Sequence, residues 1–392
     1  MSRRRRIGTW SLVIVAGLAA PWPARAAADF WSRGSIAIAG YRDDNLLSTA
    51  GPGEEDTVRR LTPAVETGFR SGRLWFAARY AQDAESFAAH PDLDTLRARQ
   101  SGDFELESRA TRALTVSLRG TYARTLAPGE LNLETGLLAG RSAATRLTLD
   151  PSLVFRPGER STGRAGLALA RDDLDGGIGS RTGRAFLGLE RRTSVKGAAG
   201  IEYAVTRYVF DSGEPATAHS LSLGWEGALG RRTNVSVRGG PRYSGGAVDP
   251  EGALTLSHDR RRVDLSLSFS RSLATVIGRS GTVTTTGISP ALAVRPGPRW
   301  SFTVAPHRYR TRDATGGESV TVDLVTFDAA WEACRWLAIE LSWQRVLQEG
   351  SLGNPPPGGV PSPVAIERNL LLLRAVARPG SRPGRVATGG SA

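Results

Sequence analysis

The chain alternates apolar and polar residues over many short stretches. The stretch from Val263 to Ser270 reads VDLSLSFS, with every odd position apolar and every even position polar. The same period of two recurs at 114–119, 187–190, 201–205, 221–225 and 337–343. Successive side chains of a β-strand point to opposite faces, so these segments are predicted to be strands with one apolar and one polar face. Hardly any 3.6-residue periodicity follows residue 27.

The breaks between these strands fall into two classes. Short, arginine-rich turns are predicted at 70–73, 109–113, 156–160, 192–196, 230–233, 259–262, 295–299 and 333–335. Breaks that are mostly longer and rich in Asp, Glu, Gly and Pro lie between them, at 42–57, 83–95, 126–141, 171–181, 211–217, 245–248, 275–281, 312–318 and 348–363. The short turns recur roughly every 37 residues, which accommodates two strands and one loop.

Eight short turns join sixteen strands, and single strands at 33–41 and 365–376 bring the number to eighteen. An even number of strands, with both chain ends on the short-turn side, is typical of outer-membrane barrels. The fold class is therefore predicted as all-β: a transmembrane antiparallel up-and-down β-barrel of about 18 strands, with short periplasmic turns and longer extracellular loops. A secreted β-sandwich, β-propeller or adhesin is the alternative, because its strands also alternate.

Aromatic residues and two irregular segments refine this prediction. Phe69, Phe155 and Trp300 each lie beside a short turn in the apolar phase, as an interfacial aromatic girdle requires. The segment 321–331 changes phase near Leu324, which predicts a β-bulge, and the segment 370–373 has no polar face.

The first 26 residues have the pattern of an export signal. Four arginines at 3–6 precede a short apolar run at 12–20, and Ala24-Arg25-Ala26 provides small residues for cleavage. An apolar run of about ten residues is too short to span a bilayer as a helix. The predicted organisation is a secretory signal peptide at 1–26, a barrel at 27–378 and a disordered tail at 379–392. A membrane anchor and a twin-arginine signal are the alternatives for the leader.

The net charge of the chain depends on whether the predicted signal peptide is counted. The 392 residues include 51 Lys and Arg against 38 Asp and Glu, for a net charge of +13. Such a basic chain would suggest a nucleic-acid partner. Cleavage removes five arginines and no acid, which leaves about +8, so no nucleic-acid partner is expected. The single cysteine, Cys334, excludes a disulfide framework and a multi-thiolate metal site.

The segment YRDDNLL at 41–47, followed by Asp56, Val58, Leu61 and Pro63, resembles the opening of the exosortase/PEP-CTERM-associated outer-membrane β-barrel family, a group of porin-like proteins. The resemblance implies a location in the outer membrane of a Gram-negative bacterium and a link to exopolysaccharide production or export. It implies no catalytic residues. The expected partners are outer-membrane lipid and lipopolysaccharide, the barrel-assembly machinery and polysaccharide-export components. The last strand departs from the usual pattern, because 369–377 contains no aromatic residue.

The polar faces of the strands supply the candidate pore-lining residues. If the apolar faces contact lipid, the charged neighbours face the lumen, since an arginine at the bilayer midplane costs roughly 2 to 4 kcal/mol. An eighteen-stranded barrel can enclose an aqueous channel. The width of such a channel and the electric field of its wall charges select which solutes pass. The alternative is that these charges only solvate the lumen. The candidates are Glu105, Glu107, Arg119, Glu190, Glu202, Glu226, Arg238, Asp264, Asp323 and Glu340.

Other chemistry is sparse in the sequence. The four histidines, His90, His219, His258 and His307, have no second ligand at a metal-binding spacing. No nucleophile elbow is present either, so no enzyme activity, cofactor or metal is expected. Asp43, Asp44 and Asn45 form an acidic loop cluster whose spacing does not match an EF-hand, and a solvated loop is the favoured interpretation over a divalent-cation site.

These features predict porin-like passage of hydrophilic solutes, or a role accessory to exopolysaccharide export. A non-conducting structural or adhesive surface barrel is the alternative. An outer-membrane hydrolase is a third hypothesis, because side chains from distant strands can converge on a barrel wall.

Overall fold

The computed structural model describes residues 29–314, 318–350 and 364–378. The predicted signal peptide, the C-terminal tail and most of the last predicted loop lie outside the described residues. The predicted division of the chain into leader, barrel and tail therefore stays a prediction.

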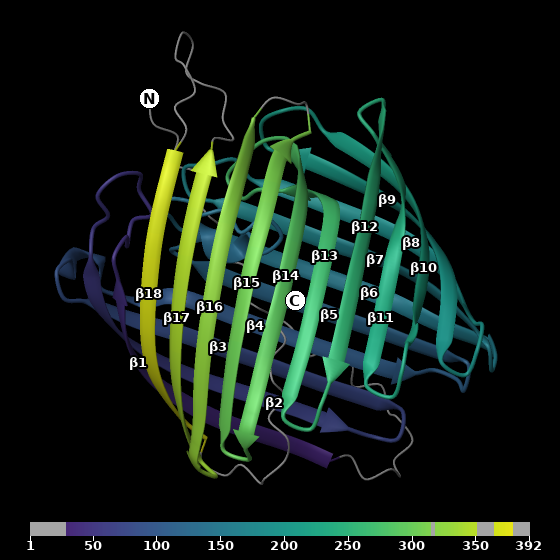
Figure 1. Cartoon of the computed structure of the whole chain (residues 1–392), viewed down its shortest axis with the longest axis horizontal. Coiled ribbons are helices and arrows are strands. Elements are labelled where there is room, and N and C mark those ends of the chain that lie inside the picture. The colour runs from purple at the N-terminus through teal and green to yellow at the C-terminus, as the bar shows by residue number, and fades with distance from the viewer. Residues whose placement is uncertain (1–28, 315–317, 351–363, 379–392) are drawn as a thin grey trace, which may run out of the picture.

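Eighteen antiparallel strands form one closed sheet, in which each strand pairs with its sequence neighbours and β1 pairs with β18 (Figure 1). The fold class and the number of strands are thus as predicted. The strands are β1 (Asp29–Asp43), β2 (Asp56–Arg70), β3 (Leu74–Phe87), β4 (Thr95–Arg109), β5 (Leu114–Thr125), β6 (Ala144–Gly158), β7 (Ser161–Leu174), β8 (Ser180–Arg192), β9 (Gly197–Phe210), β10 (Ala216–Ala228), β11 (Thr233–Ser244), β12 (Ala247–Asp259), β13 (Val263–Thr275), β14 (Thr282–Gly297), β15 (Trp300–Asp313), β16 (Ser319–Cys334), β17 (Leu337–Gly350) and β18 (Val364–Ala377).

The connections alternate as the sequence indicates. Each predicted short turn joins two strands at one edge of the barrel, and the longer connections lie at the other edge. Two of the longer connections contain a single 3-10 turn, η1 (Pro91–Leu93) and η2 (Pro128–Leu131). Among the described residues, no helix has the length and apolar character to span a membrane.

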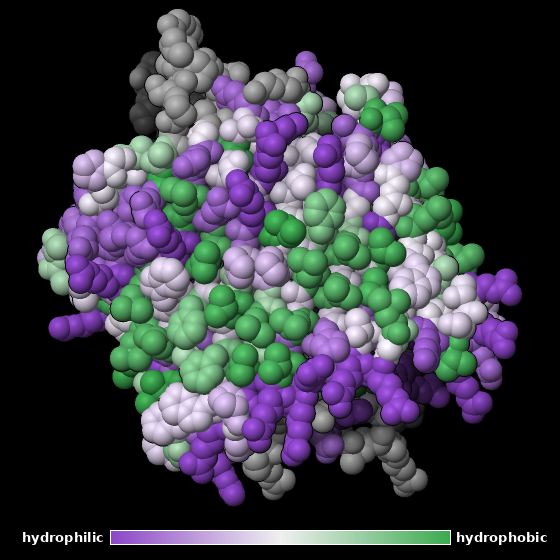
Figure 2. Space-filling view, in the orientation of Figure 1, coloured by the Kyte–Doolittle hydropathy of each residue, from purple (hydrophilic) through white to green (hydrophobic). Residues whose placement is uncertain are grey.

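The alternation along each strand places apolar side chains on the outside of the ring. In β1, Ile36 and Ile38 are 53% and 64% exposed, whereas Ala37 and Ala39, which alternate with them, are buried. Figure 2 shows the result as an apolar band around the visible wall, bordered by hydrophilic side chains at both edges. An apolar band between polar edges is the surface that a lipid bilayer requires.

The predicted aromatic residues lie on the outward face at the short-turn edge. Phe69 lies between Phe30 and Phe76, with ring centroids 5.6 and 5.7 Å away. Trp300 of β15 stacks on Trp331 of β16 at 5.6 Å, and Phe155 is 49% exposed. This edge therefore carries the aromatic side chains that favour a membrane interface.

The predicted bulge near Leu324 is wrong, and with it the placement of Asp323. Pairing of β16 with β15 is unbroken from Ser319 to Trp331, so the strand keeps one phase. Asp323 faces outward, directly opposite Arg308, and Arg308 Nε lies 3.5 Å from Asp323 Oδ1. Its apolar neighbours Val322 and Leu324 face the lumen instead.

Candidate functional site: the lumen and its constriction loop

The connection between β5 and β6, residues 126–143, folds into the barrel and crosses it. Leu137 near its tip is 4% exposed and lies in one apolar cluster with Val283, Val320 and Val322. These valines belong to β14 and β16, on the opposite side of the ring from β5 and β6. The segment 126–143, named here the constriction loop, therefore spans the lumen near the long-loop edge.

Glycine at the tip allows the constriction loop to contact the far wall closely. Gly136 has a φ of +64°, and a Cβ at this position would lie 2.7 Å from Tyr309 Cδ2. Only glycine combines this backbone conformation with so close an approach at little cost. Beside it, the Leu138 backbone N–H donates to Gln348 Oε1 over 2.8 Å.

The base of the constriction loop is fixed by buried hydrogen bonds. Asn132 is 3% exposed, and its Oδ1 accepts from the Ile277 backbone N–H of the β13–β14 connection over 3.1 Å. Its Nδ2 donates to the Leu137 carbonyl oxygen. Arg146 of β6 donates to the Leu131 carbonyl oxygen and to both oxygens of Asp172. Buried polar groups with several partners hold a segment in one position, because each buried donor or acceptor that loses its hydrogen bond costs about 1 to 3 kcal/mol.

One side of the constriction loop faces a ladder of alternating charges on β2, β3 and β4. Arg60 Nη2 donates to Glu85 Oε1 over 2.6 Å, and Arg60 Nε lies 3.5 Å from Asp83 Oδ2. Arg99 Nε extends the ladder to the loop by donating to Glu130 Oε2 over 2.9 Å. Burial alone would raise the pKa of the Glu130 carboxyl, but the charge of Arg99 and the Thr125 hydroxyl hold it below its usual value.

The other side presents one carboxylate toward the lumen. Glu134 is exposed, and it makes no ion pair within the part of the chain that the structure describes. The surrounding barrel walls displace part of the water around the Glu134 carboxyl, and this desolvation raises its pKa, whereas the charges of Arg146 and Arg184 oppose the rise. This side of the constriction therefore carries an ionisable side chain that is exposed to solvent.

Nine of the ten predicted lumen residues lie on the inward face by strand register, and Asp323 is the exception. Most pair with a charge across or along the strands: Glu105 with Arg119, Glu107 with Arg109, Glu190 with Arg164, Glu202 with Arg184 and Arg238, Asp264 with Arg295, and Glu340 with Arg374. Glu226 has no ion pair among the described residues. Arg119 and Arg164 keep side-chain exposures of 66% and 53%, so water reaches the lumen wall. That these residues line a conducting pore stays a prediction.

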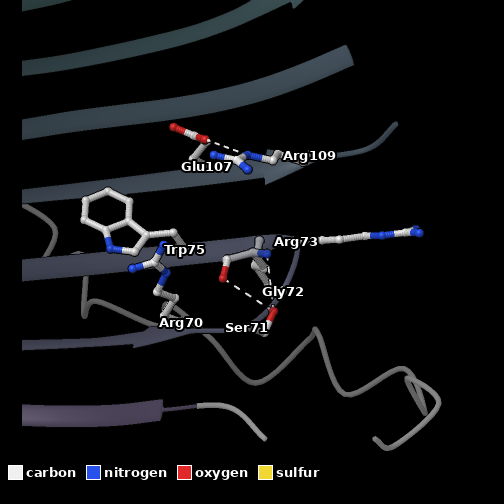
Figure 3. A pocket seen from close by; sticks show the side chains of 8 residues that line it. Arg70, Ser71, Gly72, Arg73, Trp75, Glu107 and Arg109 are labelled. Atoms are coloured by element: carbon white, nitrogen blue, oxygen red, sulfur yellow. Dashed lines mark hydrogen bonds and ion pairs between the residues drawn. The ribbon is translucent and has the colours of Figure 1, made fainter. Parts of the chain in front are cut away.

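The short-turn end of the lumen has a shallow pocket on the wall formed by β2, β3 and β4 (Figure 3). Arg70 lies beside Trp75, and Glu107 is joined to Arg109 by an ion pair of 3.7 Å. Arg73 in the adjoining turn points past the strand ends. The predicted lumen residue Glu107 is thus part of a charged rim at this mouth.

The acidic cluster closes the barrel and is not a solvated loop. Asp43 and Asn45 are 0% and 1% exposed, which overturns the favoured interpretation of these two residues. Arg368 of β18 donates to both oxygens of Asp43, and Asn369 Nδ2 donates to Asp44 Oδ2 over 2.7 Å. These contacts tie β1 to β18 at the seam where the sheet closes.

Each histidine makes a side-chain hydrogen bond: His90 with Asp56, His219 with Tyr203, His258 with Thr233 and His307 with Ser289. The Asp56 carboxylate raises the pKa of His90, which lies beside η1. No group of three or more His, Cys, Asp or Glu side chains within 29–314, 318–350 and 364–378 could hold a metal ion.

Sequence reasoning missed the constriction loop and its residues Glu130, Glu134 and Leu137. A signal for it was present in the irregular segment 321–331, and the segment 370–373 held a similar signal for the β1–β2 connection. Leu324 contacts the Leu137 cluster, and the inward Leu370 and Leu372 pack against a buried cluster that includes Leu46 of the β1–β2 connection. Apolar residues on a lumen face therefore marked the places where loops fold inward.

Comparison with known proteins supports the fold. No family model matches the chain, and no curated protein matches it. Among solved structures, OccK2 (OpdF) of Pseudomonas aeruginosa is similar, with a TM-score of 0.50, 11% identity and coverage of 88% of this chain and 98% of that one. OpdO of P. aeruginosa (TM-score 0.48, 10% identity, 88% and 97% covered) and its siderophore receptor PirA (0.41, 10%, 88% and 80%) are also similar. At such identities the likeness to OccK2 shows the fold alone, that of an outer-membrane β-barrel.

Proposed function

We propose that the protein is a porin-like channel of the outer membrane of a Gram-negative bacterium and that it passes small hydrophilic solutes. The observation that carries this proposal is the charged, water-accessible inner wall inside a closed ring with an apolar exterior. A wall of this kind replaces the hydration of a polar solute on its way across the bilayer. No reaction is needed for this role.

The constriction loop would determine which solutes pass through the lumen. It narrows the lumen from β5 and β6 toward β14–β17, with the charge ladder on one side and Glu134 on the other. A solute must then fit the space beside the loop and tolerate the field of the charges there. The assignment to the exosortase-associated family and the link to exopolysaccharide export stay predictions that rest on the opening motif YRDDNLL.

Planar-bilayer recording tests the channel, and Glu134 makes the test specific to this constriction. The wild type is expected to conduct, with a cation preference that falls when Glu134 is protonated. The pKa of Glu134 is raised above its ordinary value of 4.5. As the solution is acidified, Glu134 therefore becomes protonated, and the cation preference falls, at a higher pH than an ordinary glutamate would give. The reversal potential in a salt gradient, measured from pH 8 to pH 4, reports the change.

The matched control is Glu130→Gln, because Glu130 is held charged by Arg99 and its pKa is lowered. Glu134→Gln is expected to abolish this pH-dependent change, and Glu130→Gln is expected to keep it. An unchanged profile in Glu134→Gln would contradict the placement of this carboxylate in the ion path. Absence of any conductance above that of an empty bilayer would favour the non-conducting structural or adhesive barrel.

A further inference from the structure

The outward face carries two groups of arginines close to the long-loop edge. Arg171, Arg181 and Arg207 lie on β7, β8 and β9, and Arg308, Arg310 and Arg312 lie at alternate positions of β15. Strand register places them on the same face as exposed apolar residues such as Leu169, Leu187 and Val304. These six side chains, named here the outer arginine groups, therefore extend from the lipid-facing wall.

Most arginines of the lumen pair with carboxylates, whereas the outer arginine groups largely do not. Arg171 binds Asp173 over 2.9 Å, and Arg308 lies 3.5 Å from Asp323. The other four, Arg181, Arg207, Arg310 and Arg312, have no ion pair with any residue that the structure describes. Four guanidinium groups on the outside of this edge therefore have no ion pair with a described residue, and the strand positions place them beside lipid.

Asp173 compensates the charge of Arg171, but no carboxylate of the described residues compensates that of Arg181 opposite it. Arg171 and Arg181 lie directly opposite each other in adjacent strands, and like charges in that position repel. An arginine on the lipid face costs least, about 0 to 1 kcal/mol, where the hydrocarbon ends. The outer arginine groups lie there, within a few residues of the strand ends. Guanidinium groups at this depth match the phosphates of lipid headgroups in geometry as well as charge.

We propose that the outer arginine groups bind the phosphate groups of lipopolysaccharide in the leaflet around the long-loop edge. The proposal rests on insertion of the barrel in the outer membrane, as proposed above, but does not require that the lumen conducts. Bound phosphates would neutralise the four arginines of these groups that have no ion pair with a described residue, which are Arg181, Arg207, Arg310 and Arg312. Each arginine near an anionic surface contributes on the order of fivefold in affinity.

Native mass spectrometry of the protein released from phosphatidylcholine nanodiscs tests the proposal, with bisphosphorylated lipid A as the probe. One variant combines Arg171→Gln, Arg181→Gln and Arg207→Gln, and a second combines Arg308→Gln, Arg310→Gln and Arg312→Gln. The matched control combines Arg73→Gln, Arg112→Gln and Arg160→Gln, which removes three exposed arginines from the short turns. Figure 3 shows that Arg73 points past the strand ends, away from a position beside lipid.

Each loop-edge variant is expected to lose bound lipid A by about tenfold or more, while the control keeps it. Dephosphorylated lipid A is expected to be bound no better than phosphatidylcholine. Equal loss in the control, or full retention in both loop-edge variants, would overturn the proposal. Heat-modifiable gel migration shows whether each variant is folded, and unchanged conductance of the variants separates this result from the test of the channel.

Discussion

At the residue scale, burial decides which ion pair matters for stability. The Asp43–Arg368 pair closes the β1–β18 seam with side-chain exposures of 0% and 16%. The Arg345–Glu367 pair joins β17 to β18 on the outward face with exposures of 53% and 52%. An unpaired buried carboxylate is far costlier than an unpaired exposed one, because water cannot replace the lost partner.

Arg368→Gln is therefore expected to lower the free energy of unfolding by about 3 kcal/mol or more, because it leaves Asp43 buried without its guanidinium. Arg345→Gln is the matched control and is expected to change that free energy by about 0 to 1 kcal/mol. Urea unfolding in lipid vesicles, followed by tryptophan fluorescence, measures both. Equal losses in the two variants would show that the seam is not held by the buried pair.

At the element scale, the constriction loop depends on contacts between segments far apart in the chain. Gly136→Val is expected to push the loop tip off Tyr309 and so raise the single-channel conductance. The control is Gly51→Val, since Gly51 has a φ of +91° but nothing within 4 Å of a Cβ. Both variants should lose about 1 to 3 kcal/mol of stability from backbone strain, and only the first should alter the conductance. A similar rise in the control would mean that strain, not loss of the wall contact, changes the pore.

The strands and turns could be predicted from the sequence because each depends on local pattern. Alternation marks a strand and its faces, and a short arginine-rich break marks a hairpin. The phase of β16 could not be predicted this way, because Val320 and Val322 face inward to pack against Leu137 from a loop more than 180 residues earlier. The role of Asp43 was missed for the same reason, since its partner Arg368 lies at the other end of the chain.

At the scale of the whole molecule, the ring separates two kinds of charge. Inside, arginines and carboxylates pair between strands, as Glu202 of β9 does with Arg184 of β8 and Arg238 of β11. Outside, the middle of the visible wall is apolar and the charges gather at its edges (Figure 2). This division is the physical basis of both proposals, because the inner charges would meet solutes and the outer arginines would meet lipid.

Modification of single cysteines by a charged, water-soluble thiol reagent tests this division most directly. In a Cys334→Ala background, Thr148→Cys places a thiol on the inward face of β6, and Leu147→Cys places one on the adjacent outward position. With the protein in a planar bilayer, the reagent is expected to block part of the current through the Thr148→Cys channel and to leave the Leu147→Cys channel unchanged. Equal modification of both thiols, or a current that responds only at Leu147→Cys, would contradict a water-filled lumen inside a lipid-facing wall.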